Sequence, residues 1–292
     1  MTTTATATTQ SIWLDLLGAE VRYYDAAGVR TRSIEAGTGE TVIMLHGIGG
    51  HAEAFARNVI PLGEQFNARS IDYYGHGFTG NNGKPFTKDT YVQHLIDFMD
   101  AAGIKKAHLI GESLGGWIAA WTAIDHPERV GKVIYTVGAH LQVPIDEATK
   151  AKTAAGMGEL VRLSKQFMAE PSREHVYERL RWLFHKPDRD ISEELIDLRW
   201  ALYQAALGKP NPASSLGDVK DELTPETLAR IKAPMLFLWT DHNPSQQVAT
   251  AKVAMSYVPN AEWALIEDAG HWPQWEHPAL FNTIVSDYLK KP

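Results

Sequence analysis

The chain contains no cysteine among its 292 residues. This absence excludes disulfide bonds, thiolate metal sites and a cysteine nucleophile together. Histidines and carboxylates show no cluster at metal-ligand spacing, so we expect neither a metal ion nor another cofactor. Any catalysis is therefore expected to depend on oxygen and nitrogen atoms of the chain itself.

The chain also lacks an excess of positive charge and long hydrophobic runs. The net charge is −7, whereas a nucleic-acid surface needs a basic stripe. No stretch approaches the roughly 18 apolar residues of a membrane helix. The first ten residues, rich in threonine and alanine, have neither the positive charge nor the apolar segment of a signal peptide. We therefore expect a cytoplasmic protein that binds a small-molecule substrate and contacts neither membrane nor nucleic acid.

Short apolar runs alternate with amphipathic helical patterns from Glu20 onward, which is typical of a parallel sheet covered by helices on both faces. The predicted strands are residues 21–24, 31–35, 41–45, 68–72, 107–110, 130–137, 235–239 and 263–267. Helices are expected at residues 87–102, where apolar residues recur at helical spacing, and at residues 114–126, which end before Pro127. The alternation predicts an α/β fold.

The alternation stops near Ala139 and resumes at Ala233. The intervening pattern is helical, with breaks at Pro144, Pro171, Pro187 and Pro210. An interruption of this kind predicts a helical lid inserted over one end of the sheet. We therefore divide the chain into a flexible tail (residues 1–19), an α/β core (residues 20–138 and 226–292) and a lid (residues 139–225).

Residues 111–115 have the pattern G-x-S-x-G, with Ser113 at its centre, between a predicted strand and a predicted helix. The pattern indicates a sharp strand-to-helix turn whose strained backbone needs glycines on both sides of the serine. The helix N-terminus behind the hydroxyl favours developing negative charge. The motif alone occurs often by chance. Its strand–turn–helix context and its companion residues nevertheless favour Ser113 as a nucleophile over a plain glycine-rich junction.

The loop after the third predicted strand, residues 46–50, reads His-Gly-Ile-Gly-Gly. A loop at this place can turn a backbone N–H toward the serine, opposite the N–H of the residue after the serine. Two such donors stabilise a tetrahedral oxyanion, typically by about 3 kcal/mol each. We predict an oxyanion hole made by the N–H groups of Ile48 and Leu114, in preference to a plain tight turn.

His271 follows the last predicted strand and a short loop that contains Gly270. The chain holds 12 histidines, and His46, His51 and His76 could also lie near the mouth of the site. Only His271 has the expected position, after a strand and last in the order serine, acid, histidine. We expect it to act as the general base.

These residues together resemble enzymes of the α/β-hydrolase fold, and more narrowly the meta-cleavage product hydrolases. The similarity runs from about Val29 to Leu289 and is most informative at residues 57–59, 75–77, 113–116, 193–200 and 270–276. The resemblance implies a mostly parallel eight-stranded sheet flanked by helices. It also implies cofactor-independent, serine-dependent cleavage of a carbon–carbon bond in ring-opened aromatic compounds.

The third member of the catalytic triad departs from the family pattern. After the strand at residues 235–239, relatives usually carry an aspartate where this chain has Asn243. An asparagine can hold the tautomer of the histidine but brings no charge to stabilise the imidazolium. Asp241 could replace it if the loop is shaped differently. Asp241 and Asn243 are equal candidates, and Asp146 or Glu147 ranks below them.

The resemblance also implies a substrate pocket. The lid arginine that matches Arg199 contacts the carboxylate and 2-oxo group of the substrate in that family, and the tryptophan that matches Trp272 lines the same pocket. A planar guanidinium suits a 2-oxo-carboxylate because it can donate two parallel bonds. Without its Glu-Glu-Leu and Trp200 context, Arg199 would be read as an ordinary surface arginine of a lid helix.

Gly47 and Glu112 are the remaining candidates for contact with the substrate. Glu112 stands where many relatives have an asparagine, and Ala54 stands where several have another. A carboxylate repels an anionic substrate unless it points away or is protonated. The polar pocket of the family is therefore not reproduced in full.

The function implied is hydrolysis of a 2-hydroxy-6-oxo-hexa-2,4-dienoate-type compound to a 2-hydroxydienoate and a carboxylic acid. The alternative is a carboxylesterase or lactonase with the same serine and histidine. A non-catalytic ligand-binding member of the fold is a further alternative, which Asn243 favours and the intact serine, histidine and oxyanion loop oppose. The resemblance leaves a homo-oligomer open.

Overall fold

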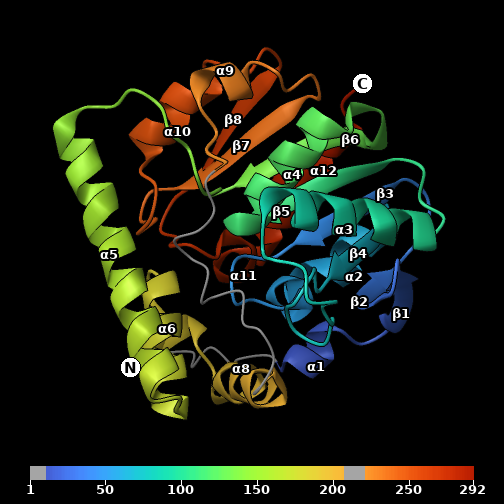
Figure 1. The fold of residues 1–292 in the computed structure, drawn as a ribbon, viewed down its shortest axis with the longest axis horizontal. Helices are drawn as coiled ribbons and strands as arrows, with labels where there is room; N and C mark the ends of the chain where they lie inside the picture. Colours follow the sequence, from blue (N-terminus) through green and yellow to red (C-terminus); the bar gives the residue numbers. More distant parts are fainter. Residues whose placement is uncertain (1–10, 207–220) are drawn as a thin grey trace, which may run out of the picture.

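An eight-stranded sheet with helices on both faces forms the centre of the molecule (Figure 1). This computed structural model describes residues 11–206 and 221–292. The strands are β1 (Glu20–Ala26), β2 (Val29–Ala36), β3 (Thr41–Leu45), β4 (Asn67–Ile71), β5 (Ala107–Glu112), β6 (Val130–Thr136), β7 (Met235–Thr240) and β8 (Ala261–Ile266). Their order is β1-β2-β4-β3-β5-β6-β7-β8, and β2 is antiparallel to β1 and β4 while the remaining pairs are parallel. The predicted mostly parallel sheet is confirmed, with each predicted strand end within two residues of the observed one.

Two hydrophobic cores lie on the two faces of the sheet. Alternate residues of β3 show the division, since Ile43 belongs to one core and Val42 to the other. Helices α3 (Lys88–Ala101), α4 (Leu114–Asp125) and α10 (Val248–Met255) cover the first core. Helices α1 (Ile12–Asp15), α2 (Ala56–Gly63) and α12 (Pro278–Lys290) cover the second. Because both faces are covered, β7 is an unbroken apolar run that is fully buried.

The predicted lid contains α5 (Glu147–Ala169), α6 (Arg173–Leu183), α7 (Pro187–Asp190) and α8 (Glu193–Ala206), and Figure 1 shows α5, α6 and α8 grouped beside the sheet. A single β-bridge between Leu141 and Leu223 joins the two ends of this insert. The short helices α9 (Pro225–Leu228) and α11 (Pro273–Glu276) complete the fold, with 3₁₀ turns at Ala52–Phe55 and Pro127–Arg129. Pro210, expected as a break in the lid, lies outside the described residues.

Part of the predicted N-terminal tail forms the short helix α1. Ser11 caps α1 by accepting a hydrogen bond from the N–H of Trp13, and Ile12 of this helix is buried. The carboxylate of Glu194 on α8 accepts hydrogen bonds from the Ser11 hydroxyl and the Ile12 N–H. Within the predicted tail, residues 11–15 therefore pack against the lid, and the first ten residues lie outside the described part. None of the helices in residues 11–206 and 221–292 is long and apolar enough to cross a bilayer.

Candidate active site

Ser113 lies on the turn between β5 and α4, and its backbone has φ 53° and ψ −116°. This left-handed conformation is strained for a residue with a side chain. Close packing of the turn requires the glycines around it. A Cβ atom on Gly111 would lie 2.2 Å from the carbonyl oxygen of Gly115, and one on Gly115 would lie 2.1 Å from that of Leu45. The turn therefore has the geometry that the G-x-S-x-G pattern predicts.

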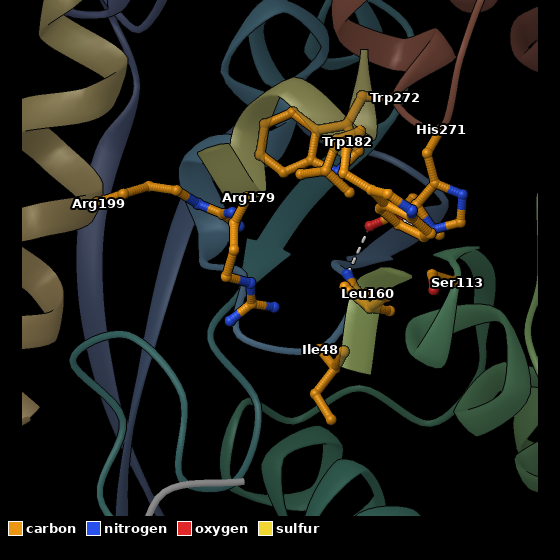
Figure 2. A pocket seen from close by; sticks show the side chains of 11 residues that line it. Ile48, Ser113, Leu160, Arg179, Trp182, Arg199, His271 and Trp272 are labelled. Atoms are coloured by element: carbon orange, nitrogen blue, oxygen red, sulfur yellow. Dashed lines mark hydrogen bonds and ion pairs between the residues drawn. The ribbon is translucent and has the colours of Figure 1, made fainter. Parts of the chain in front are cut away.

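The site around Ser113 has two compartments, and Figure 2 shows the side chains that line the narrower one. One is a narrow pocket of about 30 Å³, and the other is a larger cavity of about 370 Å³. Both are lined by Ile48, Ser113, Leu160, Trp182 and His271. The narrow pocket is completed by Gly47, Glu112, Arg179, Leu183, Arg199 and Trp272. The larger cavity is completed by Leu114, residues 139–142, Met157, Glu222, Ser245 and Gln246. Ser113 and His271 thus lie where the two compartments meet.

His271 is buried, and its Nδ1 atom lies 2.7 Å from Oδ1 of Asn243. The orientation of the Asn243 amide is fixed because its Nδ2 atom donates to the carbonyl of Gln246 and its Oδ1 atom accepts from Ser245. Oδ1 must therefore accept from His271, which places the imidazole proton on Nδ1. The Nε2 atom of a neutral His271 is then left with its lone pair free to take a proton.

Of the acid candidates, Asn243 is the one that contacts His271 in the described part of the chain. The carboxylate of Asp241 accepts from the N–H of Ala269 at 3.3 Å and lies 3.6 Å from His242, so the prediction for Asp241 fails on geometry. Asp146 does not orient His271 either. It caps α5 by accepting from the N–H of Thr149, and Glu147 is exposed in the first turn of that helix.

Asn243→Asp is expected to raise hydrolysis at neutral pH by about 10-fold. Burial lowers the pKa of His271 to about 3, which makes the imidazole a weak base. A carboxylate at position 243 would stabilise the imidazolium and bring that pKa closer to the working pH, where a general base is most effective. The pH profile of kcat/KM measures the shift, because its acid limb should move to higher pH. Asp241→Asn is the matched control, and a variant Asn243→Asp with the native profile would contradict the expectation.

Glu112 is 1% exposed and faces the loop that contains Gly47. Its Oε2 atom accepts from the N–H of Gly47 at 2.6 Å, and its Oε1 atom lies 3.2 Å from Nε2 of His271. Burial raises the pKa of this carboxyl to about 8, against the opposing effects of the Gly47 bond and Arg199. Glu112 is therefore mostly protonated at neutral pH and adds little repulsion toward an anion. The sequence placed it near the substrate but gave no indication of its contact with His271.

The predicted oxyanion donors lie beside Ser113. Ile48 lines both compartments, and Leu114 lines the larger one. Within residues 11–206 and 221–292, neither backbone N–H has a hydrogen-bond acceptor. Leu114 is also the first residue of α4, where the helix leaves its initial N–H groups unpaired. Both groups are therefore available to a negatively charged oxygen formed at Ser113.

Arg199 reaches the narrow pocket from α8 (Figure 2). Its guanidinium donates weakly to the carbonyl of Gly49 at 3.3 Å and lies 4.9 Å from the ring centre of Trp272. Burial lowers the pKa of Arg199 to about 9, and repulsion by Arg179 adds to the effect. Trp272 is buried and lines the pocket beside it. The pocket thus contains a cation with weak hydrogen-bond partners.

Arg179 is a pocket residue that the sequence reasoning missed. It extends from α6 toward the same space as Arg199 (Figure 2). Among the described residues its Nε atom is buried without a hydrogen-bond partner, and burial lowers its pKa to about 10. The sequence contained a weak indication of this position. Arg179 follows the buried Val176 by three residues and therefore lies on the same face of the helix. Two desolvated arginines that form no ion pair with a carboxylate of the described residues favour the entry of an anion.

Electrostatics and geometry together define what this site can do. A hydroxyl, a buried imidazole with a free Nε2 atom and two unpaired backbone donors suit nucleophilic addition to a carbonyl. The paired arginines add recognition of an anionic group on one side of that carbonyl. In the described ranges, no three histidine or carboxylate side chains are arranged to hold a metal ion.

Several known proteins are similar to this chain in sequence or in fold. The alpha/beta hydrolase family model matches residues 42–284. The chain is 31% identical to the 2-hydroxy-6-oxo-6-phenylhexa-2,4-dienoate hydrolase of Burkholderia cepacia, over 87% of this chain and 89% of that protein. The structure of a meta-cleavage product hydrolase from Pseudomonas fluorescens IP01 superposes with a TM-score of 0.74 at 23% identity, covering 94% and 98% of the two chains. Naproxen esterase from Bacillus subtilis superposes with a TM-score of 0.78 at 22% identity, covering 96% of each chain.

Proposed function

Because this chain belongs to the alpha/beta hydrolase family, we propose that it is a serine-dependent hydrolase of a carbon–carbon bond in a 2-hydroxy-6-oxo-hexa-2,4-dienoate-type substrate. The observation that carries the proposal is the division of the site at Ser113 into a narrow cationic pocket and a larger cavity. A substrate with an anionic head, a central carbonyl and a bulky far end fits this division. The relative from Burkholderia cepacia is named for a substrate of this class.

The anionic head is assigned to the narrow pocket. Arg179 and Arg199 both line it, and burial depresses the pKa of each. A carboxylate between the two guanidinium groups replaces the interactions with water that burial removed. The pocket therefore binds an anion more tightly than a neutral group. Trp272 supplies a flat apolar wall beside the conjugated chain. The larger cavity, of about 370 Å³, then accepts the substituent beyond the cleaved bond.

The chemistry needs the dienoate rather than an ordinary ketone. A simple ketone does not fragment by hydrolysis, because its leaving carbon would be a bare carbanion. In a 2-hydroxy-6-oxo-dienoate, ketonisation places a proton on carbon 5 and allows the departing fragment to leave as a stabilised dienolate. Ser113, activated by His271, or a water that it positions, adds to the carbon 6 carbonyl. The oxyanion then accepts from the N–H groups of Ile48 and Leu114, and collapse gives a 2-hydroxydienoate and a carboxylic acid.

A carboxylesterase or lactonase is the second candidate, and one observation favours it. The chain superposes on an esterase as well as on a meta-cleavage product hydrolase, with TM-scores of 0.78 and 0.74. The serine, the histidine and the oxyanion donors serve both reactions. Only the two arginines of the narrow pocket separate them, since a small neutral ester gains nothing from desolvated cations.

Parallel assays on one enzyme sample separate the two candidates. A yellow dienoate with an alkyl or phenyl end is followed by loss of its visible absorbance, and p-nitrophenyl acetate is followed by release of nitrophenolate. The proposal expects a kcat/KM for the dienoate at least 100-fold above that for the ester, since two cationic contacts at about 1.5–3 kcal/mol each act on one substrate alone. Brisk ester turnover with slow bleaching would favour the esterase.

Arg179→Met is expected to raise KM for the dienoate by about 10-fold, the loss of one charge-assisted contact. Ester hydrolysis should change little. The same substitution should raise the melting temperature by about 2–4 °C, because it removes a buried Nε atom without a partner. Arg181→Met is the matched control, since Arg181 is exposed on the same helix. Equal losses on both substrates, or in both variants, would show that Arg179 does not bind the anionic head of the substrate in the narrow pocket.

A further inference from the structure

Glu112 takes no part in the reaction as proposed above, although it precedes Ser113 and contacts the base. Both its carboxyl oxygens lie beside groups of the reacting centre. Oε2 accepts from Gly47, the residue before the oxyanion donor Ile48, and Oε1 lies 3.2 Å from Nε2 of His271. That contact is not aligned as a hydrogen bond in this conformation, and Oε1 has no other polar partner among the described residues. A buried polar atom therefore faces the pocket unsatisfied.

The hydrogen bonds around His271 decide where the protons of this pair lie. Asn243 fixes the imidazole proton on Nδ1, so a neutral His271 presents a lone pair at Nε2. An ionised Glu112 would place a second lone pair 3.2 Å away, and the two atoms would repel each other. One shared proton removes this conflict. Burial raises the pKa of Glu112 to about 8 and lowers that of His271 to about 3, so the proton belongs to the carboxyl in the resting enzyme.

We propose that Glu112 is a second acid–base residue of this site, which donates a proton to the substrate chain while His271 takes one from the substrate. The proposal rests on the proposed function. The 2-hydroxyl group of the dienoate gives its proton to Nε2 of His271. The double bonds shift toward carbon 2, and carbon 5 takes the proton of the Glu112 carboxyl. The substrate is then the ketone, and the enzyme holds a carboxylate and an imidazolium.

The enzyme returns to its resting state by one transfer. The imidazolium proton passes from Nε2 of His271 to Oε1 of Glu112 across the existing 3.2 Å contact. Both groups are neutral again, and no reagent from outside is consumed. The freed Nε2 atom can then activate Ser113 for addition to the carbonyl. The pair thus separates the two proton transfers of ketonisation without a metal or a second histidine.

The charged groups around Glu112 suit this exchange. Arg199 of α8 lines the same pocket and favours the carboxylate when it forms, and Arg179 of α6 is a further cation of that pocket. Tyr73, after β4, is buried and its pKa is raised by burial, so it brings no charge. Asn243 brings none from the loop after β7. Within the described residues, Glu112 is therefore the one carboxylate in contact with His271. It lies at Nε2, whereas Asn243 fills the place at Nδ1 that an aspartate has in a conventional triad.

Glu112→Gln tests the proposal with little change of shape. The amide oxygen can still accept from Gly47, and the amide nitrogen faces His271, but the side chain cannot release a proton. Stopped-flow measurement of the loss of the dienol absorbance should show ketonisation slowed by about 100-fold or more, the usual contribution of a general acid. In the native enzyme the rate should fall as the pH rises through about 8, where Glu112 loses its proton. The variant should lack this limb.

Two further measurements separate a chemical role from a structural one. Hydrolysis of p-nitrophenyl acetate at pH 7 needs no ketonisation, so Glu112→Gln should slow ketonisation of the dienoate by a factor at least about 10 times larger than any loss on the ester. Glu112→Asp restores a carboxyl and should recover part of the rate together with a pH limb. A Glu112→Gln enzyme that ketonises at the native rate with the native pH profile would overturn the proposal. A native enzyme that leaves the dienoate unchanged would instead remove the proposed function, and the role of Glu112 with it.

Discussion

Ser113→Ala is expected to lower turnover of both the dienoate and p-nitrophenyl acetate by about 10⁴-fold or more. Among the described residues, Ser113 is the one serine that lines both compartments together with His271. The hydroxyl of Ser245 lies on the other side of the imidazole, 3.5 Å from Nδ1, and donates to Asn243. The oxyanion donors and the arginines remain, so substrate should still bind to the variant. Bleaching and nitrophenolate release measure the loss, and a thermal melt confirms that the variant is folded.

The outcome of Ser113→Ala also separates catalysis from mere binding. A fluorophosphonate probe should label the native protein and leave the alanine variant unlabelled, because only an activated serine reacts with it. A protein that binds the dienoate but is never labelled would be a ligand-binding member of the fold. Retention of more than a tenth of the native bleaching rate by Ser113→Ala would show that the nucleophile lies elsewhere.

Arg199→Gln is expected to lower kcat/KM for the dienoate by about 100-fold while ester hydrolysis changes little. A bidentate, charge-assisted contact to a 2-oxo-carboxylate contributes about 1.5–3 kcal/mol. The loss should be large here because, among the described residues, Arg199 has only weak bonds, to Gly49 and His51, which a ligand can replace. Initial rates on both substrates, taken over a range of concentrations, divide the effect between KM and kcat.

Arg199→Lys is the matched variant for this test. A lysine keeps the charge but cannot donate two parallel bonds from a planar group. It should therefore fall between the native enzyme and Arg199→Gln on the dienoate. If Arg199→Gln lost the same factor on the ester as on the dienoate, the arginine would support the lid rather than hold the substrate.

The parts of the fold with a strong periodic signal were predictable from the sequence. β3 and β7 each contain an unbroken apolar run, residues 42–45 and 235–239, and the turn at Ser113 is specified by glycines that admit no Cβ atom. The packing of α1 against α8 was not predicted. It depends on hydrogen bonds from Ser11 and Ile12 to the carboxylate of Glu194, and such contacts produce no periodic pattern in the sequence.

The electrostatic arrangement of the site was less predictable. The choice between Asp241 and Asn243 depends on the shape of one loop. In that loop Asn243 donates to the carbonyl of Gln246 and accepts from the hydroxyl of Ser245. The contact between Glu112 and His271 joins residues far apart in the sequence, and no spacing rule connects them. Arg179 likewise becomes a pocket residue only through the way α6 packs over the core. The chemical type of each site residue could be predicted from the sequence, whereas the group that each charged side chain contacts could not.

Product analysis tests the central claim most directly. Native enzyme is incubated with a dienoate that carries a phenyl end, and benzoate and the 2-hydroxydienoate are quantified by chromatography as the colour disappears. Cleavage of the carbon–carbon bond predicts one benzoate and one 2-hydroxydienoate for every dienoate consumed, and none from Ser113→Ala. Loss of colour without benzoate, or brisk hydrolysis of p-nitrophenyl acetate beside an unchanged dienoate, would contradict the assignment.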